Sequence, residues 1–539
     1  MRTVAAAVAL AAAITILLTP SKPAAPVSAW HPRHAVVAGA FHVHTNRSPD
    51  SSASLDEAVA AANRAGLQFV VSTEHGDGTR EPLVPAYRDG VLWIEGVEIS
   101  TTDGHYATAG MSRAPYVLAG EGRDVADDVR RLGGFGVAAH GDSPKSEAQW
   151  RDWHAPIDGL EWLNLDSVWR EAGLARLARA TITYWFRGPA TLASLGSRPD
   201  ATLRHVDARA EHAHTIVIAA SDAHGAMIPS YEACFEAFST RVELDAPLTG
   251  NASRDAAAII AALRSGHHYT SIDALAPPAF EFSAREGATT ATEGDVLPEG
   301  ESVTFDIHAA GPAGARSALL RNGVPVQDSL APSWHHETSG QPAEYRVEVT
   351  LPSSPGQPPL PWIVSNPIFV GLPRAESAPA SGGPADVKTL VVTPPLAWRV
   401  EKDGASTADA SSTASDVRLQ YALGEGAPRN QFAAAAAPAP ATLAAARGIT
   451  FTVQAQAPVR FSVEIRGAAD HRWHRSVYAD ATPRQVTVAF DDMRPVEPNA
   501  DPHPDLSHAE AILFLVGVSN TVPGSSGTLS LSDVSLIVR

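Results

Sequence analysis

The sequence of 539 residues contains a single cysteine, Cys234. One cysteine excludes an intrachain disulfide and any metal site built on thiolates, so a bound metal would have to be held by oxygen and imidazole nitrogen. An excess of basic residues is also lacking, since 59 acidic against 41 basic residues give a formal net charge of −18. The acidic residues are spread without a long block of like charge, and no nucleic acid is expected as a general partner.

The only stretch long and apolar enough for a membrane lies at the N-terminus. Met1-Arg2 is followed by an uncharged stretch, residues 3–21, and by the small residues Val27-Ser-Ala29, which resemble a cleavage site. This order is typical of a secretory signal in residues 1–29, with a retained membrane anchor as the alternative. Either reading predicts an exported protein, periplasmic or secreted. A membrane partner is expected only if the segment is retained.

The length predicts two to four domains. Residues 36–274 alternate short apolar runs with helical stretches rich in Ala, Leu, Asp and Arg, which predicts an α/β barrel or a closely related layout. Ser54-Leu-Asp-Glu57 is a capping box and predicts a first helix that ends at Gly66. Residues 255–265 are predicted as the last helix of this domain, ending at Gly266.

After residue 277 the pattern changes to that of all-β domains. Residues 278–372 alternate polar and apolar side chains with period two and predict a small antiparallel, Ig-like sandwich. Residues 373–386, rich in Pro, Ala, Ser and Gly, predict a linker. Residues 387–539 predict a second β domain, with loops or a disordered insertion at 404–446.

Six apolar runs of the first domain each end on polar side chains, mostly histidine or a carboxylate. They are residues 36–44, 69–75, 91–98, 136–140, 159–164 and 215–224. Continuous apolar runs suit parallel strands buried on both faces, and the C-terminal ends of such strands meet at one mouth. In His42-Val-His44 the spacing puts both rings on one face, and Asp222-Ala-His224 repeats it. Histidine and carboxylates gathered at one mouth predict a metal site, in which Glu98 could bridge two ions.

These strand ends carry motifs in a fixed order. They are Phe41-His-Val-His-Thr45, Ser48-Pro-Asp50, Val71-Ser-Thr-Glu-His75, Gly96-Val-Glu-Ile-Ser100, Ala138-Ala-His140 and Ser221-Asp-Ala-His224. The series resembles the motifs of the PHP superfamily, named for polymerase and histidinol phosphatase, over residues 36–273. The resemblance implies a distorted β/α barrel with two or three divalent metal ions, which could be zinc, manganese or iron.

The resemblance also implies the metal ligands, position by position. Those of a first ion are His42, His44, Glu98 and Asp222. Those of a second are Glu98 as a bridge, His140 and, as a further candidate, His105. Those of a third are Asp50, His75 and His224. Two positions depart from the family pattern: Glu74 stands where an aspartate is usual, and Pro49 lengthens the step to Asp50.

Further polar side chains lie near the predicted ligands in the sequence. Arg47, between two predicted ligands, is expected to bind an anionic substrate and to act in catalysis together with Glu98 and Asp222. Lys145 either meets a phosphate oxygen or is a solvated loop lysine. Glu161 is expected to support the ligands and not to bind metal. The pair His212-Ala-His214 precedes a strand and is expected to be incidental.

Together these features predict a metal-dependent phosphoesterase. Divalent ions would lower the pKa of a bound water to near neutrality and neutralise the charge on phosphate oxygens. The expected substrate is a phosphorylated small molecule or a component of the cell envelope. Two alternatives remain: a metal-stabilised, non-catalytic scaffold, and a hydrolase of a non-phosphate bond at the same cluster.

The β domains are expected to play supporting or binding roles. Residues 362–369 are similar to a strand that follows the catalytic domain in exported PHP proteins, and we expect them to pack against the barrel. The last domain resembles a galactose-binding-like or family-11-type carbohydrate-binding jelly roll, through residues 459–465, 473–478 and the terminal strand. Trp473 and Tyr478 either stack on a glycan or are buried in the sandwich.

Overall fold

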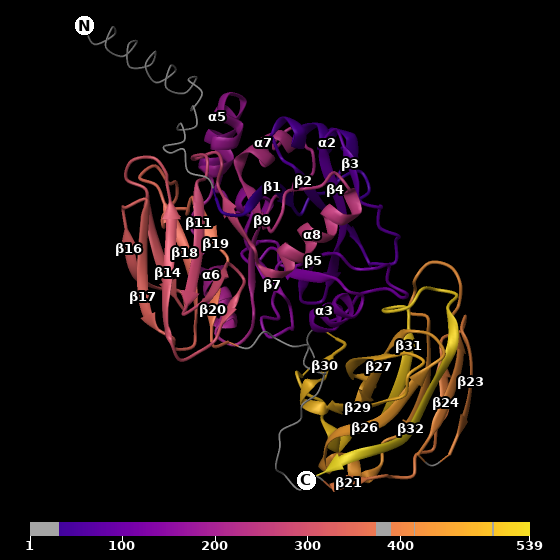
Figure 1. Ribbon diagram of the computed structural model, residues 1–539. Helices are drawn as coiled ribbons and strands as arrows, with labels where there is room; N and C mark the ends of the chain where they lie inside the picture. Colours follow the sequence, from indigo (N-terminus) through magenta and orange to yellow (C-terminus); the bar gives the residue numbers. More distant parts are fainter. Residues whose placement is uncertain (1–31, 373–389, 414, 498–500, 539) are drawn as a thin grey trace. The chain divides into compact units, whose positions relative to one another are not determined.

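The computed structural model describes residues 32–372, 390–413, 415–497 and 501–538, which form two compact units (Figure 1). The first unit comprises residues 1–112 and 125–376, and the second comprises residues 113–124 and 377–539. The predicted signal or anchor at 1–29 and the predicted linker at 373–386 lie outside the described residues. Within the described residues, no helix combines the length and apolar character needed to cross a membrane.

The first unit is built around a curved sheet with two sets of parallel strands. The first set is β1 (Ala35–Phe41), β2 (Phe69–Gly76) and β4 (Val91–Thr101). The second set is β6 (Phe135–Ala138), β7 (Gly159–Asn164) and β8 (Ile216–Ala220). The six apolar runs are therefore strands, as predicted. Beyond the strands, Val43 and Ala223 form a bridge that joins the end of β1 to the end of β8, so the sheet is barrel-like.

One strand departs from the expected parallel order. Antiparallel β5 (Gly104–Ala109) lies between β4 and β6, because β4 turns back directly at Thr101–Gly104. A tight turn of this kind can join only antiparallel neighbours, whereas parallel strands need a long crossover. The short β3 (Ala86–Arg88) also pairs with β4 in antiparallel fashion.

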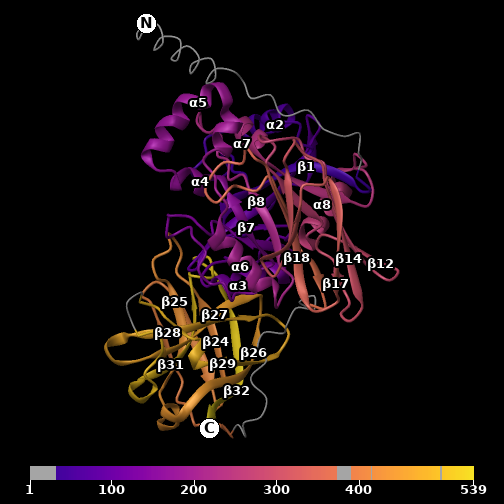
Figure 2. The same ribbon diagram turned by 90° about the vertical axis from the view of Figure 1, so that its left-hand side faces the viewer.

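Helices connect the strands, and both predicted helices are present. The helices are α2 (Leu55–Arg64), α3 (Gly122–Arg131), α4 (Leu165–Glu171), α5 (Leu174–Ala193), α6 (Asp200–Ala210), α7 (Tyr231–Ala237) and α8 (Ala252–Ser265). The capping box at Ser54 and Glu57 is formed as predicted. Helix α8 begins three residues before the predicted start, because Asn251 caps it, and it ends at Gly266 with φ of 83°. Figure 2 shows α5 as a bent helix beside α7.

The predicted sandwich at 278–372, called here the middle sandwich, shares a sheet with the barrel. One of its sheets is antiparallel and consists of β11 (Phe280–Glu286), β12 (Thr289–Thr292), β14 (Ser302–Ala309) and β17 (Ser333–Ser339). The other contains β13 (Val296–Leu297), β15 (Arg316–Arg321), β16 (Val324–Ser329), β18 (Ala343–Thr350), β19 (Ile363–Ser365) and β20 (Ile368–Val370). Strand β19 pairs with β10 (His268–Ser271), β10 with β9 (Ser239–Leu244), and β9 with β1. The prediction that residues 362–369 pack against the barrel is confirmed.

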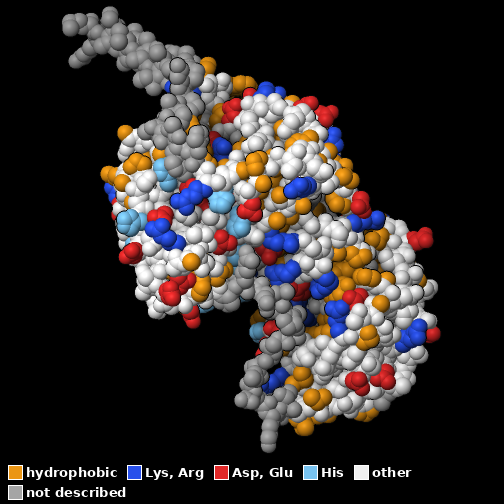
Figure 3. Space-filling model, viewed as in Figure 1, with side chains coloured by type: hydrophobic (Ala, Val, Ile, Leu, Met, Phe, Trp, Pro, Cys, Tyr) orange, Lys and Arg blue, Asp and Glu red, His pale blue; other side chains and the backbone are white. Residues whose placement is uncertain are grey.

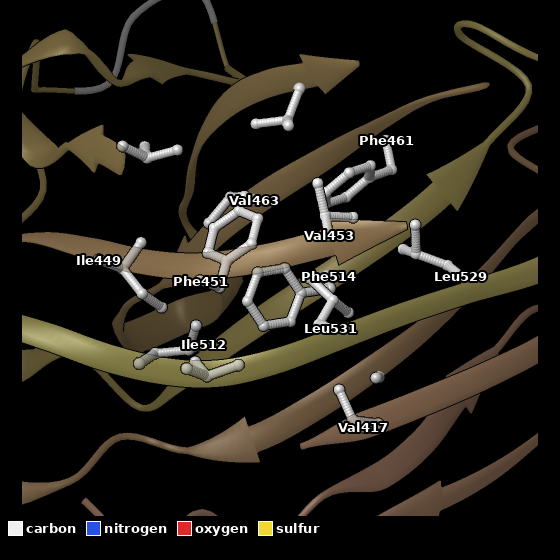
Figure 4. Close-up of a cluster of buried hydrophobic side chains, with 14 of the residues drawn as sticks. Val417, Ile449, Phe451, Val453, Phe461, Val463, Ile512, Phe514, Leu529 and Leu531 are labelled. Carbon is white, nitrogen blue, oxygen red and sulfur yellow. The ribbon is translucent and has the colours of Figure 1, made fainter. Parts of the chain in front are cut away.

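The second unit is a sandwich of two six-stranded antiparallel sheets. One sheet consists of β21 (Leu390–Val392), β23 (Thr407–Ser412), β24 (Val417–Ala422), β26 (Ala446–Ala455), β29 (Arg484–Ala489) and β32 (Ser526–Val538). The other consists of β22 (Arg399–Lys402), β25 (Phe432–Pro438), β27 (Val459–Arg466), β28 (Arg472–Ala479), β30 (Arg494–Pro495) and β31 (Ala511–Gly517). Figure 4 shows the core between them, where the rings of Phe451 and Phe514 lie 5.1 Å apart.

One expectation for this unit needs correction, and one open alternative is decided in favour of burial. Residues 404–446 are not mainly loops, because they contain β23, β24 and β25, and the alanines at 433–437 are buried. Alanine runs look like low-complexity sequence, yet their small side chains fit a closely packed sheet interior. Trp473 is buried in the core and donates a hydrogen bond to the Asp501 carbonyl oxygen at 2.7 Å, so it cannot stack on a sugar. Tyr478 is half-buried, with the Arg484 guanidinium over its ring.

Charge is distributed over the surface as the composition predicts. On the face shown in Figure 3, acidic and basic side chains are interspersed over the first unit. Surface ion pairs of this kind contribute little to stability. The fold therefore depends on its buried contacts, of which those that join the barrel to the middle sandwich concern the site most directly.

Asn366 is a fully buried side chain at that junction. Its Oδ1 accepts from the Val217 backbone N–H at 2.7 Å, and its Nδ2 donates to the carbonyl oxygens of Val217 (3.0 Å) and His268 (2.8 Å). We expect Asn366→Ala to lower the free energy of unfolding by about 2 kcal/mol or more, because buried backbone groups lose their partner. Differential scanning calorimetry should show a lower first transition, whereas Gln341→Ala, at an exposed position of the same sandwich, should not move it. Equal transitions in the two variants would contradict the assigned role.

Candidate metal centre

The structure brings all nine predicted metal ligands together at one end of the barrel-like sheet, where the parallel strands have their C-terminal ends. They form four overlapping groups in which the ligand atoms lie within 4.8 Å of one another. The groups are His42, His44 and Glu98; His42, His140 and Asp222; His75, Glu98 and His105; and His44, Asp50, His75 and His224. Among the described residues, the groups that could hold a metal contain these nine side chains and no others. We call this set the nine-residue cluster.

The backbone at three of these positions is strained. His42, His140 and Asp222 have φ of 64°, 56° and 45°, in the left-handed region that residues other than glycine rarely occupy. Each lies just after a strand, where the turn redirects the side chain towards the mouth. The conformations are held by tertiary contacts, such as the Asp222 N–H donating to the His42 carbonyl oxygen at 2.6 Å. Strain of this kind is typical of functional sites.

Glu98 lies at the centre of the cluster, with 1 % of its surface exposed. Its Oε1 is 2.7 Å from His105 Nδ1 and 3.1 Å from His140 Nε2. Its Oε2 accepts no hydrogen bond in the described structure. The nitrogen atoms around that oxygen, at 3.1–3.3 Å, are His75 Nδ1, His42 Nε2 and His44 Nε2. A carboxylate with imidazoles on both oxygens has the arrangement needed to bridge two cations.

Hydrogen bonds on the far side of the rings set which nitrogen faces the cluster. His42 Nδ1 is 2.5 Å from Glu161 Oε1, and His224 Nδ1 is 2.9 Å from the Asp222 carbonyl oxygen. In the neutral form that binds a metal, an acceptor at Nδ1 keeps the hydrogen on that nitrogen, so each Nε2 offers a lone pair. Partners of this kind orient metal-binding histidines in proteins. Glu161 thus orients His42, a predicted ligand, which agrees with the expected supporting role.

Ser48 and Glu74 set the orientation of the His44 ring. Ser48 Oγ accepts from the His75 backbone N–H at 2.8 Å and donates to Glu74 Oε2 at 2.9 Å, so it can only accept from His44 Nδ1 at 3.0 Å. Glu74 is buried and also accepts from the Thr45 N–H and hydroxyl, at 2.9 and 2.6 Å. The glutamate that departs from the family pattern therefore anchors the loop after β1. The sequence singled out Glu74 as unusual but did not indicate this contact.

In the neutral forms of His42 and His44, the Nε2 lone pairs face each other. Their Nε2 atoms are 3.0 Å apart. On the other side of each ring, Nδ1 of His42 contacts the Glu161 carboxylate, and Nδ1 of His44 contacts the Ser48 hydroxyl. Two lone pairs at this distance repel unless a positive charge lies beside them. The pair, together with the unbonded Oε2 of Glu98, fits a shared divalent cation. The mixture of imidazole and carboxylate suits zinc, manganese or iron.

Electrostatics favour positive charge throughout the cluster. Burial opposes a charged imidazole, but hydrogen bonds to Asp222 and Glu98 outweigh it and raise the pKa of His44 to about 9. For His140, burial is likewise outweighed, by the charge of Asp222 and the contact with Glu98, and the pKa rises to about 9. Burial also opposes ionisation of Glu98, yet the surrounding histidines hold its pKa well below the usual value. The cluster is thus an electronegative site that attracts cations.

The outer end of the cluster is open to solvent. Asp50 Oδ2 lies 3.0 Å from His75 Nε2 and 3.2 Å from His224 Nε2, so Pro49 does not prevent Asp50 from reaching both rings. The Asp50 side chain is 44 % exposed, whereas His42 and His44 are fully buried. Burial opposes ionisation of Asp50, but its hydrogen bonds with His224 and His75 lower its pKa. The third predicted group is therefore formed at the mouth.

The two predicted phosphate-binding side chains have other partners. Arg47 donates from Nε and Nη2 to the two carboxylate oxygens of Glu95, at 2.9 and 3.3 Å. Lys145 is an exposed loop residue 3.9 Å from Glu147. Their roles in substrate binding stay predictions.

Asn164 is a site residue that the sequence did not reveal. It donates from Nδ2 to Glu161 Oε2 at 2.9 Å and to Asp222 Oδ2 at 3.2 Å, and its Oδ1 caps α4. Its place at the end of an apolar run was the one available signal. The side chain links a cluster carboxylate to the carboxylate that orients His42.

The surroundings of His214 agree with the expectation that the pair His212-Ala-His214 is incidental. His214 Nε2 lies 3.0 Å from the Gly294 carbonyl oxygen in the middle sandwich, and neither His212 nor His214 belongs to the metal-ligating groups of the described residues.

No family model matches the sequence, and no curated protein matches it. Solved structures are similar over part of the chain. The family 11 carbohydrate-binding module of a cellulosomal cellulase of Clostridium thermocellum is 14 % identical and covers 26 % of this chain and 88 % of its own, with a TM-score of 0.22. An exo-beta-agarase is 9 % identical and covers 26 % of this chain and 23 % of its own, with a TM-score of 0.20. At these TM-scores the likenesses carry no argument about function.

Glu161→Gln tests the orientation of His42 without removing a ligand. The amide is a weaker acceptor and can present its NH₂ to Nδ1, so the tautomer that offers Nε2 is less favoured. We expect metal affinity to fall about 10–100-fold, with unchanged stoichiometry at saturating metal. Competition titration with a chromophoric chelator measures both quantities. Glu171→Gln, at an exposed carboxylate of α4, is the control, and an unaltered affinity in Glu161→Gln would contradict the role of Glu161.

Proposed function

We propose that the nine-residue cluster binds two or three divalent metal ions and that the protein hydrolyses phosphate esters. On this proposal the barrel-like domain is a distorted β/α barrel of the PHP superfamily. The observation that carries the proposal is Glu98, a buried carboxylate with imidazoles on both oxygens. The resemblance of the motifs, in sequence order, supports phosphate as the substrate group.

On this proposal, the buried and the exposed residues of the cluster have different roles. When bound, divalent ions supply an activated water and neutralise charge on phosphate oxygens. His42, His44 and Asp222 form the buried floor and would hold an inner ion, because Glu161, Ser48 and Asn164 orient them. Glu98 joins this floor to the outer groups. Asp50, His75 and His224 lie where a substrate can enter from solvent.

The open mouth favours catalysis over a purely structural metal. Structural sites are closed by protein ligands, whereas catalytic sites keep a position for water and substrate. Here the side chains of Asp50, His75 and His224 are 44 %, 22 % and 25 % exposed. A non-catalytic scaffold would not need ligands at the surface. Hydrolysis of a non-phosphate bond at the same ions is the alternative that the assay below separates.

Two further predictions concern the location of the protein and its binding partners. Export rests on residues 1–29, and a glycan partner rests on the resemblance of the second unit to carbohydrate-binding domains. With Trp473 buried, a glycan site there would have to use other side chains. Neither point bears on the chemistry of the cluster.

Replacing a central ligand tests the proposal directly. In Glu98→Gln and His42→Ala, we expect bound metal to fall and hydrolysis of p-nitrophenyl phosphate or bis-p-nitrophenyl phosphate to fall by more than about 100-fold, beyond the loss typical of supporting residues. Elemental analysis and the colorimetric assay, with added zinc or manganese, measure the two effects. Glu147→Gln, 66 % exposed, is the matched control.

Three outcomes distinguish the phosphoesterase from the two alternative functions. Metal-dependent turnover that the variants lose supports the phosphoesterase. Bound metal without turnover of either phosphate ester, in a folded protein, would favour the scaffold or a non-phosphate substrate. Full turnover in Glu98→Gln would show that the cluster is not the active site.

A further inference from the structure

Helix α5 exposes an apolar face, which is unusual for a helix attached to a compact domain. Leu174, Ile182, Trp185 and Phe186 are 88 %, 64 %, 63 % and 48 % exposed. Positions 174, 178, 182 and 185 follow helical spacing, so Ala178, also exposed, lies on the same face. The opposite face, with Ala180 and Tyr184, is buried against the protein. Trp185 and Phe186 are the only aromatic residues among the exposed large hydrophobic side chains of the described chain.

The loop after β8, which is hydrogen-bonded to the buried face of α5, exposes a further apolar side chain. Met227, three residues after His224, is 79 % exposed. The Tyr184 hydroxyl accepts from the Ser230 N–H at 2.7 Å and donates to Ser230 Oγ at 3.1 Å, which ties the loop to α5. Contacts between α5 and α7, which follows the loop, place the two side by side (Figure 2). The exposed side chains of Leu174, Ala178, Ile182, Trp185, Phe186 and Met227 are called here the α5 patch.

The charge of α5 differs in sign from that of the whole chain. Its twenty residues include Arg176, Arg179 and Arg187 and no aspartate or glutamate, in a protein of net charge −18. Arg176 and Arg179 are exposed, although Arg176 also donates to the Leu195 carbonyl oxygen, whereas Arg187 is half-buried. An apolar and aromatic face on a helix with exposed arginines is the pattern of helices that lie in the interface of a bilayer. Trp is favoured at that depth, and arginine is attracted by anionic headgroups.

We propose that the α5 patch docks on the surface of a lipid bilayer that contains anionic lipids. A second copy of the chain fits less well, because a symmetric contact through α5 would bring two sets of arginines together without acidic partners on the helix. Docking does not require the proposed metal chemistry. Since the patch adjoins the loop that carries His224, it would bring the mouth of the cluster close to lipid headgroups.

A fluorescent probe on α5 tests the contact in the full-length chain. Cys234 is fully buried, so a cysteine introduced as Ala178→Cys can be labelled alone with an environment-sensitive fluorophore under native conditions. We expect a blue shift and higher emission with vesicles of phosphatidylcholine and phosphatidylglycerol, and little change with phosphatidylcholine alone. About 0.5 M salt should weaken the response, because it screens the arginines.

The matched control is Val324→Cys, labelled in the same way. Val324 is 63 % exposed on β16 of the middle sandwich and lies outside the α5 patch. Both labelled proteins have the same N-terminal segment, so attachment through that segment alone would leave both probes unchanged. A shift for Ala178→Cys without one for Val324→Cys therefore reports docking by α5 itself.

Second-site variants complete the test in the Ala178→Cys protein. Trp185→Asp and Arg179→Glu should each raise the lipid concentration for half-maximal response by about tenfold. Val326→Asp, at a 42 % exposed position of β16, should have no effect. Circular dichroism checks that each variant is folded. No probe shift with anionic vesicles, equal shifts at both labelling positions, or a shift that depends on protein concentration without lipid would overturn the proposal, the last in favour of self-association.

Discussion

The burial of the Glu98 carboxylate is the constraint on which the first unit depends. An isolated buried carboxylate is very unfavourable, so it needs opposite charge and hydrogen bonds in its immediate surroundings. The five imidazoles around Glu98 provide these contacts, and their own orientation comes from residues further out. His42 and His140 adopt a left-handed backbone to reach it. One arrangement of charges around Glu98 depends on three features. They are the strained backbone at the strand ends, the bridge between the ends of β1 and β8, and the hydrogen bonds around the mouth.

This arrangement explains why the supporting residues matter as much as the ligands. Glu161 holds His42, Ser48 holds His44, and Asn164 connects Glu161 to Asp222. Loss of one such contact would free a ring to rotate, and the lone pairs of His42 and His44 would no longer converge. These hydrogen bonds hold the rings in place on the side away from the cluster. Binding then needs little reorganisation, which is the condition for precise positioning of a reacting group.

Much of the site could be predicted from the sequence because its signals are local. An apolar run that ends in His-x-His or Asp-x-His places both side chains on one face, whatever the rest of the fold does. The capping box of α2 and the glycine after α8 are local in the same sense. What escaped prediction depends on residues far apart in the chain. Arg47 pairs with Glu95, and Ser48 donates to Glu74. These contacts join the loop after β1 to β4 and β2, and no spacing in the sequence indicates them.

The same distinction applies to the architecture. Strand β5 escaped notice because its polar sequence does not read as a buried strand, and the alanines of β25 were mistaken for a loop because alanine carries little strand propensity. In both strands, burial by neighbours overrides the local preference. The predicted division into a barrel and a separate sandwich was also too simple. The division follows a change in sequence pattern, but backbone pairing between β10 and β19 joins the two parts in one sheet.

That pairing gives the middle sandwich a structural part in the site. Strand β1, which leads into His42 and His44, pairs with β9, then with β10 and finally with β19 of the sandwich. Asn366, next to β19, satisfies both backbone groups of Val217 in β8, the strand that leads into Asp222. Without residues 278–372, β10 would become an open edge, and buried polar groups beneath the cluster would lose their partners. The sandwich is therefore part of the framework that positions two of the strands that lead into the nine-residue cluster, and this framework extends to residue 372.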